Sequence, residues 1–208
     1  MSLETWGAFA IAAMILLVIP GPTIISVISH AVVNGRRAVI PLVIGVAVGD
    51  FTAMTLSILG LGAVLAASTM LFSVLKWLGV AYLLYLGIKI WRSNPEIAKT
   101  STTAAGASKR SLGTSTFTVT ALNPKSIGFF VAFLPQFVDP QGQAVPQFLL
   151  LGATFLVLGS INATLYAFFA GNLRETIQNS RARRWLNRCG GSALMGAGVF
   201  AAVMQRSS

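Results

Sequence analysis

Acidic residues, histidine and cysteine are scarce in this sequence. The chain of 208 residues has 5 Asp and Glu, one His and one Cys. A single cysteine excludes an intramolecular disulfide and leaves nothing to build a cysteine-based metal site. One histidine and one cysteine also leave few groups for a nucleophile with its base. We therefore expect no enzyme, and we expect no cofactor and no metal ion.

Apolar residues make up most of the chain. They account for 55% of it and charged residues for 10%, which is too apolar for one soluble core and indicates an integral membrane protein. Six segments are free, or nearly free, of Asp, Glu, Lys and Arg, and we expect each to cross the bilayer as a helix. They are residues 6–33, 38–66, 70–86, 112–137, 146–170 and 189–203. The first is too long for a signal-peptide core and is expected to be retained.

The formal charge of +10 could suggest a nucleic-acid partner, but its placement indicates a topology. Twelve of the 15 Lys and Arg lie in the first, third and fifth connections between the predicted helices. They are Arg36 and Arg37; Lys89, Arg92, Lys99, Lys109 and Arg110; and Arg174, Arg181, Arg183, Arg184 and Arg188. Basic connections stay on the cytoplasmic side, so both termini are predicted to lie outside. We expect lipid, and no nucleic acid, around this chain.

Two predicted helices contain a proline near their middle. Residues 18–25 are VIPGPTII, with Pro20, Gly21 and Pro22, and residues 121–130 are ALNPKSIGFF, with Asn123 and Pro124. Proline removes a backbone donor, so carbonyls one turn before it lose their partners. Inside a bilayer those carbonyls need protein, water or substrate. We expect broken helices that form a binding site at mid-membrane; the alternative is a pair of kinks that serve only packing.

The two halves of the chain contain a weak repeat. Residues 75–87 and 186–198 match at Leu75 and Leu186, Gly79 and Gly190, Leu83 and Leu194, and Gly87 and Gly198. Three crossings end on the opposite side of the membrane, so tandem three-helix units have opposite orientations. The predicted fold is all-α and integral to the membrane, with six transmembrane helices in two inverted repeats. The repeats are residues 1–92 and 112–208, joined by a polar cytoplasmic linker at 93–111.

Asp50 and Lys125 are ionisable residues that lie within predicted helices. Asp50 is near the centre of the second, and Lys125 directly follows the break in the fourth. A charge at the bilayer centre costs about 2.5–3.5 kcal/mol on insertion scales, so each needs a partner or a water-filled cavity. A structural salt bridge is one interpretation. The other is a site in which Lys125 faces a carboxylate and Asp50 faces an amine or a proton. Asn162, mid-helix in the second half, either binds substrate or bridges helices.

Four motifs in order resemble the LysE/RhtB family of bacterial amino-acid exporters. They are PGP at 20–22, GVAVGD at 45–50, LKWLGVAYLLYLGIKIW at 75–91 and NPKSIGFFVAFLPQF at 123–137. The resemblance implies export of neutral amino acids or derivatives, of the threonine, homoserine, homoserine lactone and leucine class, across the inner membrane. It implies site residues at Pro20, Gly21, Pro22, Asp50, Asn123, Pro124 and Lys125. The counterpart of Asp50 in the second half is not acidic, a departure from exact symmetry.

The expected mechanism is secondary transport. No phosphate-binding glycine loop is present, so a gradient would have to power export, and the resemblance implies the proton gradient. Asp50 is the single acidic residue within the predicted helices and the expected proton-coupling site of an antiporter. An amino-acid channel or facilitator and a membrane scaffold without transport are the alternatives. The sequence leaves open which amino acid is exported and whether the chain forms a homo-oligomer.

Overall fold

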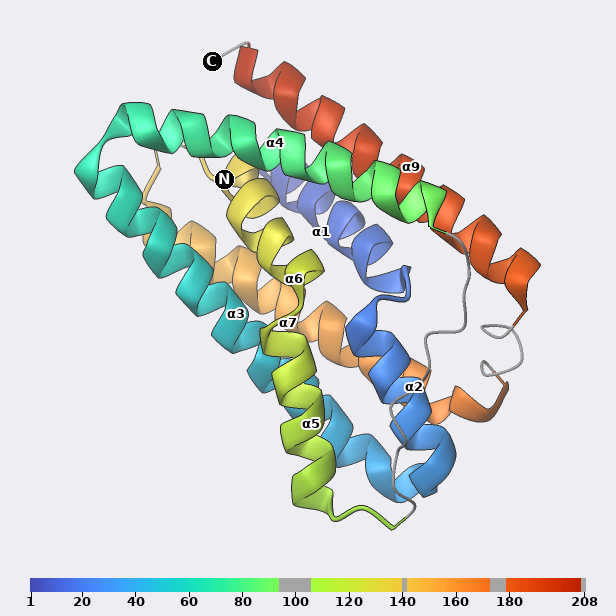
Figure 1. The fold of residues 1–208 in the computed structure, drawn as a ribbon. Coiled ribbons are helices and arrows are strands. Elements are labelled where there is room, and N and C mark those ends of the chain that lie inside the picture. The colour runs from blue at the N-terminus through green and yellow to red at the C-terminus, as the bar shows by residue number, and fades with distance from the viewer. Residues whose placement is uncertain (94–105, 140–141, 173–178, 207–208) are drawn as a thin grey trace.

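The computed structural model describes residues 1–93, 106–139, 142–172 and 179–206, and over these residues it is helical, without strands (Figure 1). The elements in chain order are α1 (Leu3–Val18), α2 (Pro22–Asn34), η1 (Gly35–Ala38), α3 (Val39–Ala67), α4 (Thr69–Arg92), α5 (Lys109–Ala121), α6 (Pro124–Gly128), η2 (Phe129–Phe133), η3 (Leu134–Phe137), α7 (Ala144–Phe168) and α9 (Ser180–Arg206). Most of the predicted linker, residues 94–105, lies outside the described residues. Residues 109–111 of that linker are helical, because Ser108 caps the N-terminus of α5.

Both proline motifs separate consecutive helices. α1 ends at Val18 and α2 begins at Pro22, and α5 ends at Ala121 and α6 begins at Pro124. The helices on either side of the second break are bent by 41°. Pro22 and Pro124 each occupy the first turn of the following helix, where the missing N–H has no intrahelical acceptor to lose. The prolines therefore begin new helices.

Glycines allow the long helices to pack closely. A β-carbon at Gly45 would lie 2.6 Å from the carbonyl oxygen of Gly113, so α3 and α5 are close to backbone contact there. A β-carbon at Gly87 would lie 2.8 Å from the carbonyl oxygen of Gly191, which brings α4 and α9 together in the same way. Figure 1 shows α4 and α9 side by side. Small residues at such crossings are typical of helix packing in membranes.

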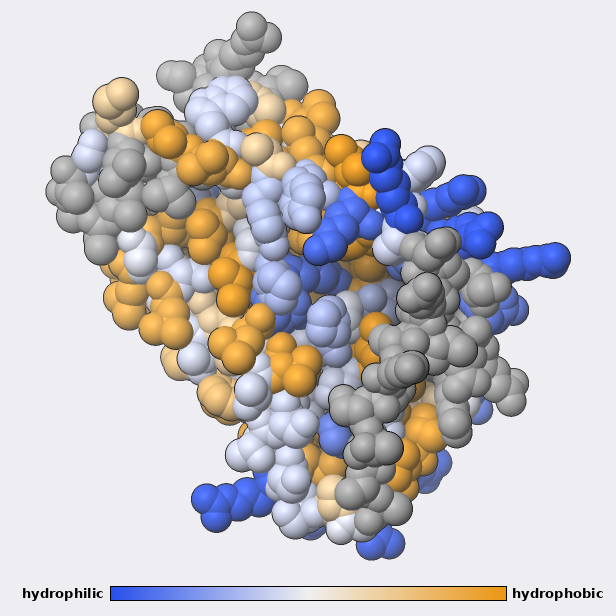
Figure 2. Space-filling model, viewed as in Figure 1, coloured by the Kyte–Doolittle hydropathy of each residue, from blue (hydrophilic) through white to orange (hydrophobic). Residues whose placement is uncertain are grey.

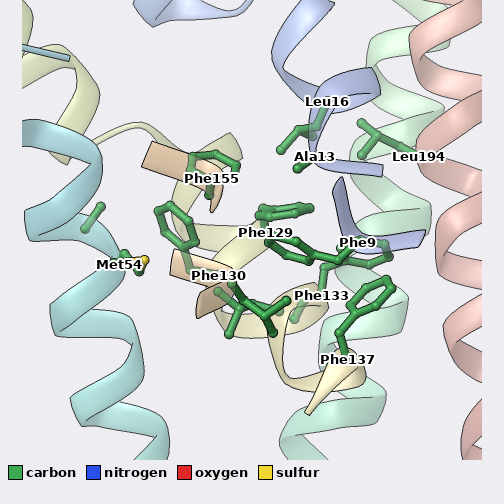
Figure 3. Close-up of a cluster of buried hydrophobic side chains, with 14 residues drawn as sticks. Phe9, Ala13, Leu16, Met54, Phe129, Phe130, Phe133, Phe137, Phe155 and Leu194 are labelled. Carbon is green, nitrogen blue, oxygen red and sulfur yellow. The ribbon is translucent and has the colours of Figure 1, made fainter. Parts of the chain in front are cut away.

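Phenylalanines fill the core beside α1 and α7 (Figure 3). Phe129 and Phe130 of η2 contact Phe155 of α7, with ring centroids 5.3 and 4.8 Å apart. Phe9 of α1 packs edge-on against Phe137, at 5.4 Å. These five rings are all less than 5% exposed. They tie the segment after the second break to both halves of the chain.

Large apolar side chains cover the outside of α3. Ile40, Ile44, Val48, Phe51 and Leu59 are between 49% and 71% exposed, and they recur at helical spacing. Figure 2 shows apolar side chains over α3 and hydrophilic ones where α4 ends and α9 begins. A continuous apolar face of this kind marks an interaction surface. In an all-helical apolar chain, such a face is suited to contact with lipid. The helices are those of a membrane protein.

By length and composition alone, two stretches of the described residues can cross a membrane, Pro22–Gly62 and Ala144–Phe168. The bent pair Lys109–Ala121 and Pro124–Phe137 makes a third, and α1 is a shorter apolar helix. Pro22–Gly62 contains the turn η1, where Gly35 adopts a φ of 66° and α2 changes direction into α3. Six spans in two inverted repeats stay a prediction.

Candidate functional site

The two breaks meet inside the molecule. Asn123 Nδ2, just before α6, donates a hydrogen bond of 3.0 Å to Thr23 Oγ1 in the first turn of α2. The Asn123 Oδ1 atom accepts from the backbone N–H of Lys125, so the same side chain also caps α6. One asparagine therefore joins the start of α2 to the start of α6.

Three consecutive carbonyls at the end of α1 accept hydrogen bonds from side chains of the second half. The pairs are Asn162 Nδ2 with the Leu17 oxygen at 3.0 Å, Tyr166 Oη with the Val18 oxygen at 2.7 Å, and Lys125 Nζ with the Ile19 oxygen at 2.6 Å. A helix end leaves its last carbonyls without intrahelical partners, and a buried carbonyl without a partner is costly. The break is therefore stabilised by side chains that are more than 100 residues away in the chain.

A small cavity of about 30 Å³ lies between the breaks. Five of the predicted site residues line it: Gly21, Asp50, Asn123, Lys125 and Asn162. The predicted prolines, Pro20, Pro22 and Pro124, are not among its lining residues. The volume gives room for about two water molecules and is too small for an amino acid. Within the described residues, no group of three His, Cys, Asp or Glu side chains could hold a metal ion there.

The two ionisable residues of the cavity have different surroundings. Asp50, on α3, is 4% exposed, and its Oδ1 atom has no hydrogen-bond partner among the described residues. The Lys125 ammonium donates to the Ile19 oxygen, and its Cδ would lie 3.3 Å from a β-carbon at Gly21. A buried carboxylate oxygen without a donor lowers the stability of the fold, which counts against a purely structural role for Asp50. Together, the two residues place groups of both signs in one cavity.

Glycines on two elements make space for these charged side chains. A β-carbon at Gly159 of α7 would lie 3.4 Å from Asp50 Oδ2, and one at Gly21 would lie 3.6 Å from Lys125 Nζ. Any side chain at either position would reduce a cavity that is already small. Gly21 was predicted from its motif, whereas Gly159 was not predicted from the sequence.

Thr23, Ser126 and Tyr166 belong to the site but were not predicted from the sequence. Thr23 and Ser126 line the cavity, and Tyr166 holds the Val18 carbonyl. Spacing could have indicated Tyr166, which is one helical turn after Asn162 and so lies on the same face. Tyr82 also supports the second break, because its hydroxyl donates to the Pro124 carbonyl at 2.9 Å.

A row of polar contacts joins α2 to the segment that contains α5. Thr23, His30 and Asn34 are spaced by seven and four residues and share one face of α2. Their partners are Asn123 at 3.0 Å, Ser115 Oγ at 3.3 Å from His30 Nε2, and the Gly106 N–H at 3.2 Å from Asn34 Oδ1. We call this row the α2/α5 seam. It leads from the cavity to the end of the molecule that carries Arg36 and Arg37.

The chain matches known proteins over nearly its whole length. Residues 14–205 match the family model described as LysE type translocator. An uncharacterized membrane protein of Vibrio cholerae is 34% identical over 98% of both chains. The homoserine/homoserine lactone efflux protein of Salmonella typhimurium is 33% identical, over 97% of this chain and 98% of its own.

A leucine efflux protein of Enterobacter is 31% identical, over 81% of this chain and 80% of its own. No solved structure matches the chain significantly. The family model covers far more than half of the residues, and the order of motifs in the sequence predicted the same family. The chain is a member of the LysE type translocator family.

Proposed function

We propose that the protein is a secondary transporter that exports neutral amino acids or close derivatives across the bacterial inner membrane in exchange for protons. The observation that carries this proposal is the cavity between the two helix breaks, which is lined by one carboxylate and one ammonium group. An amino acid carries both charges and is complementary to that pair. The efflux names of two relatives support a transporter rather than an enzyme.

Lys125 is the proposed partner of the substrate carboxylate. An ammonium group has three donors, and the Ile19 carbonyl occupies one of them, so others are free to turn toward a carboxylate. The first turns of α2 and of the segment after the second break both line the cavity, and the positive end of a helix dipole favours an anion. Gly21, Asn123 and the three prolines would hold this geometry.

Asp50 is the proposed partner of the substrate amine and, alternately, of a proton. Its unpartnered Oδ1 atom is available to either one. In this proposal a proton from outside and an amine from inside compete for the same carboxylate, and the carrier reorients only when one of them is bound. Export would then be coupled to proton entry. Asn162, which already bonds the Leu17 carbonyl, would position the break beside this group.

The cavity must widen before an amino acid can bind, because about 30 Å³ holds only water. Broken helices provide a place for this motion, since the halves on either side of a break can tilt separately. The α2/α5 seam is a polar interface that could part toward the basic end. A carrier that alternates its access in this way differs from a channel, which needs no such closure.

Counterflow in proteoliposomes tests the proposal. Vesicles loaded with unlabelled leucine or homoserine should accumulate the labelled amino acid transiently, and an imposed pH gradient should drive net transport that a protonophore abolishes. A channel would equilibrate the label without an overshoot. A scaffold would show no difference from empty vesicles. An overshoot with no effect of the pH gradient on net transport would agree with a carrier but contradict proton coupling.

A further inference from the structure

An apolar pocket lies beside the polar cavity and has no part in the function proposed so far. Its volume is about 370 Å³, within the range of about 300–1,000 Å³ that is common for small-molecule sites. Its walls come from α1, from η2 and η3, and from α9. Every lining residue is Ala, Ile, Leu, Phe or Gly, so no side chain there offers a hydrogen bond.

Thin walls separate the pocket from the polar cavity. Leu16, near the end of α1, lines both of them. Phe129 lines the pocket and Phe155 lines the cavity, and these two rings are in direct contact at 5.3 Å. Figure 3 shows Leu16 close to the α1 face that carries Ala13, in the region of both rings. Leu16 and the Phe129–Phe155 contact therefore form the wall that the two spaces share.

We propose that this pocket receives the side chain of the exported amino acid, and that it selects large apolar side chains of the leucine type. The inference rests on the function proposed above. The polar cavity has groups for the ammonium and the carboxylate but no room for a side chain, whereas the pocket has room and no polar group. Once the cavity has widened to admit the head of an amino acid between Asp50 and Lys125, the side chain extends past Leu16 into the pocket.

A lipid chain is the competing occupant. Ile11 and Ile15 line the pocket and are 65% and 43% exposed, so the pocket opens toward the outside of the bundle. The shared wall distinguishes the two occupants, because a lipid chain bound there gains nothing from continuity with a cavity that holds two charges. Only a substrate side chain couples the pocket to selectivity.

Gly196 provides a way to fill the pocket. It lines the pocket on α9, and a β-carbon added there meets no atom within 4 Å. Gly196→Leu therefore places a side chain in the open space without a backbone clash. Gly60 of α3 is the matched control: a β-carbon there also meets nothing within 4 Å, and the residue lines neither space. Leucine also raises helix propensity equally at both positions.

The experiment measures half-saturating concentrations of L-leucine, L-homoserine and L-alanine for counterflow by the full chain in liposomes. For the unmodified protein, leucine should saturate at a concentration at least about 10-fold below that for alanine. Gly196→Leu should raise the leucine value about 10-fold or more and leave the alanine value unchanged. Gly60→Leu should change neither value.

An unmodified protein that does not prefer leucine overturns the inference, however the variants fold. Equal effects of Gly196→Leu on leucine and alanine also overturn it, and so does no effect on either. A change in copurified lipid without a change in selectivity assigns the pocket to lipid. If none of the three amino acids shows counterflow, the proposed function itself fails and this inference fails with it. Exchange of alanine without a preference for leucine overturns this inference and leaves the proposed function standing.

Discussion

Asp50 and Lys125 come from different elements and line one cavity, but they differ in their hydrogen-bond partners. Lys125 already donates to the Ile19 carbonyl, whereas Asp50 Oδ1 has no donor among the described residues. Their positions allow two interpretations, a structural pair or two halves of a substrate site. The interpretations differ in what happens when one charge or both charges are removed.

Asp50→Asn and Lys125→Met separate these interpretations. For a structural pair, each single change strands the other charge and should destabilise the protein by about 3–5 kcal/mol, and the double change should restore stability and export. We expect the opposite: folded single variants that do not export, and an inactive double variant. Asp50→Asn should also lose dependence on the proton gradient. Thermal unfolding in detergent and counterflow measure both properties.

The double variant decides the matter, because the two interpretations disagree most about it. Well-folded protein with normal export would assign both charges to structure. A second comparison tests Lys125 alone. Lys125→Met should weaken competition by a free amino acid more than competition by its amide, since the amide lacks the carboxylate that the ammonium would bind.

At the scale of elements, each break is a place where one helix ends and another begins. The end of α1 is held by Asn162, Tyr166 and Lys125, and the start of α6 by Asn123 and Tyr82. All of these partners come from the protein, so the breaks persist without substrate. Continuous helices would satisfy the same carbonyls by themselves and release these side chains.

Replacing Pro20, Gly21 and Pro22 together by alanine should make α1 and α2 one helix. The fold should remain and its stability should not fall, because the helix propensity of alanine and the backbone donors that the carbonyls regain offset the side-chain hydrogen bonds that the break loses. Export should be lost, since Lys125 and Asn162 lose the acceptors that position them. Circular dichroism, thermal unfolding and counterflow measure these effects. Pro146→Ala, in the exposed first turn of α7, is the control and should leave export unchanged.

Normal export by the triple-alanine variant would show that the first break serves only packing. The corresponding change at Asn123 and Pro124 should also abolish export. It should cost more stability, because Asn123 makes the hydrogen bond that joins the two breaks.

At the scale of the whole molecule, basic residues lie near the ends of several helices. The Arg36 guanidinium lies 4.9 Å from the ring centre of Phe168, at the end of α7. Asn187 of α9 donates to Ser93, just after α4, at 2.9 Å. Figure 1 places the turn between α2 and α3 and the start of α5 at the bottom of the view, and the start of α1 and the end of α9 in its upper part. The first connection and the start of α5 therefore lie away from the start of α1, as the proposed topology requires, whereas the end of α4 and the start of α9 lie on the right of the view.

Cysteine labelling tests that topology. With Cys189 replaced by serine, cysteines at Arg37 and Arg184 should be shielded from an impermeant thiol reagent in intact cells, and a cysteine at Gln143 should react. All three residues are exposed, so burial does not explain a difference. Permeabilised cells give the control, in which all three should react. Labelling of the first two from outside would reverse the orientation.

The class of protein, its family and the places where its helices break could be predicted from the sequence alone. These features depend on local chemistry: apolar composition indicates a membrane protein, and a proline in mid-segment interrupts a helix wherever that helix packs. Asp50 and Lys125 were identifiable because a charge within an apolar segment needs a partner or a water-filled cavity. Family membership was identifiable because the motifs of the family are short, contiguous stretches of sequence.

The side chains that hold the breaks and the groups that surround the charged pair could not be predicted from the sequence, because they depend on tertiary packing. Tyr166 with Val18, and Leu16 between the cavity and the apolar pocket, depend on packing between elements far apart in the chain. The chemistry of a tyrosine does not specify which carbonyl its hydroxyl will bond, because the choice of carbonyl depends on how two helices cross. The shape of an apolar pocket is likewise decided by where α1, η2 and α9 leave space, and no single residue determines it.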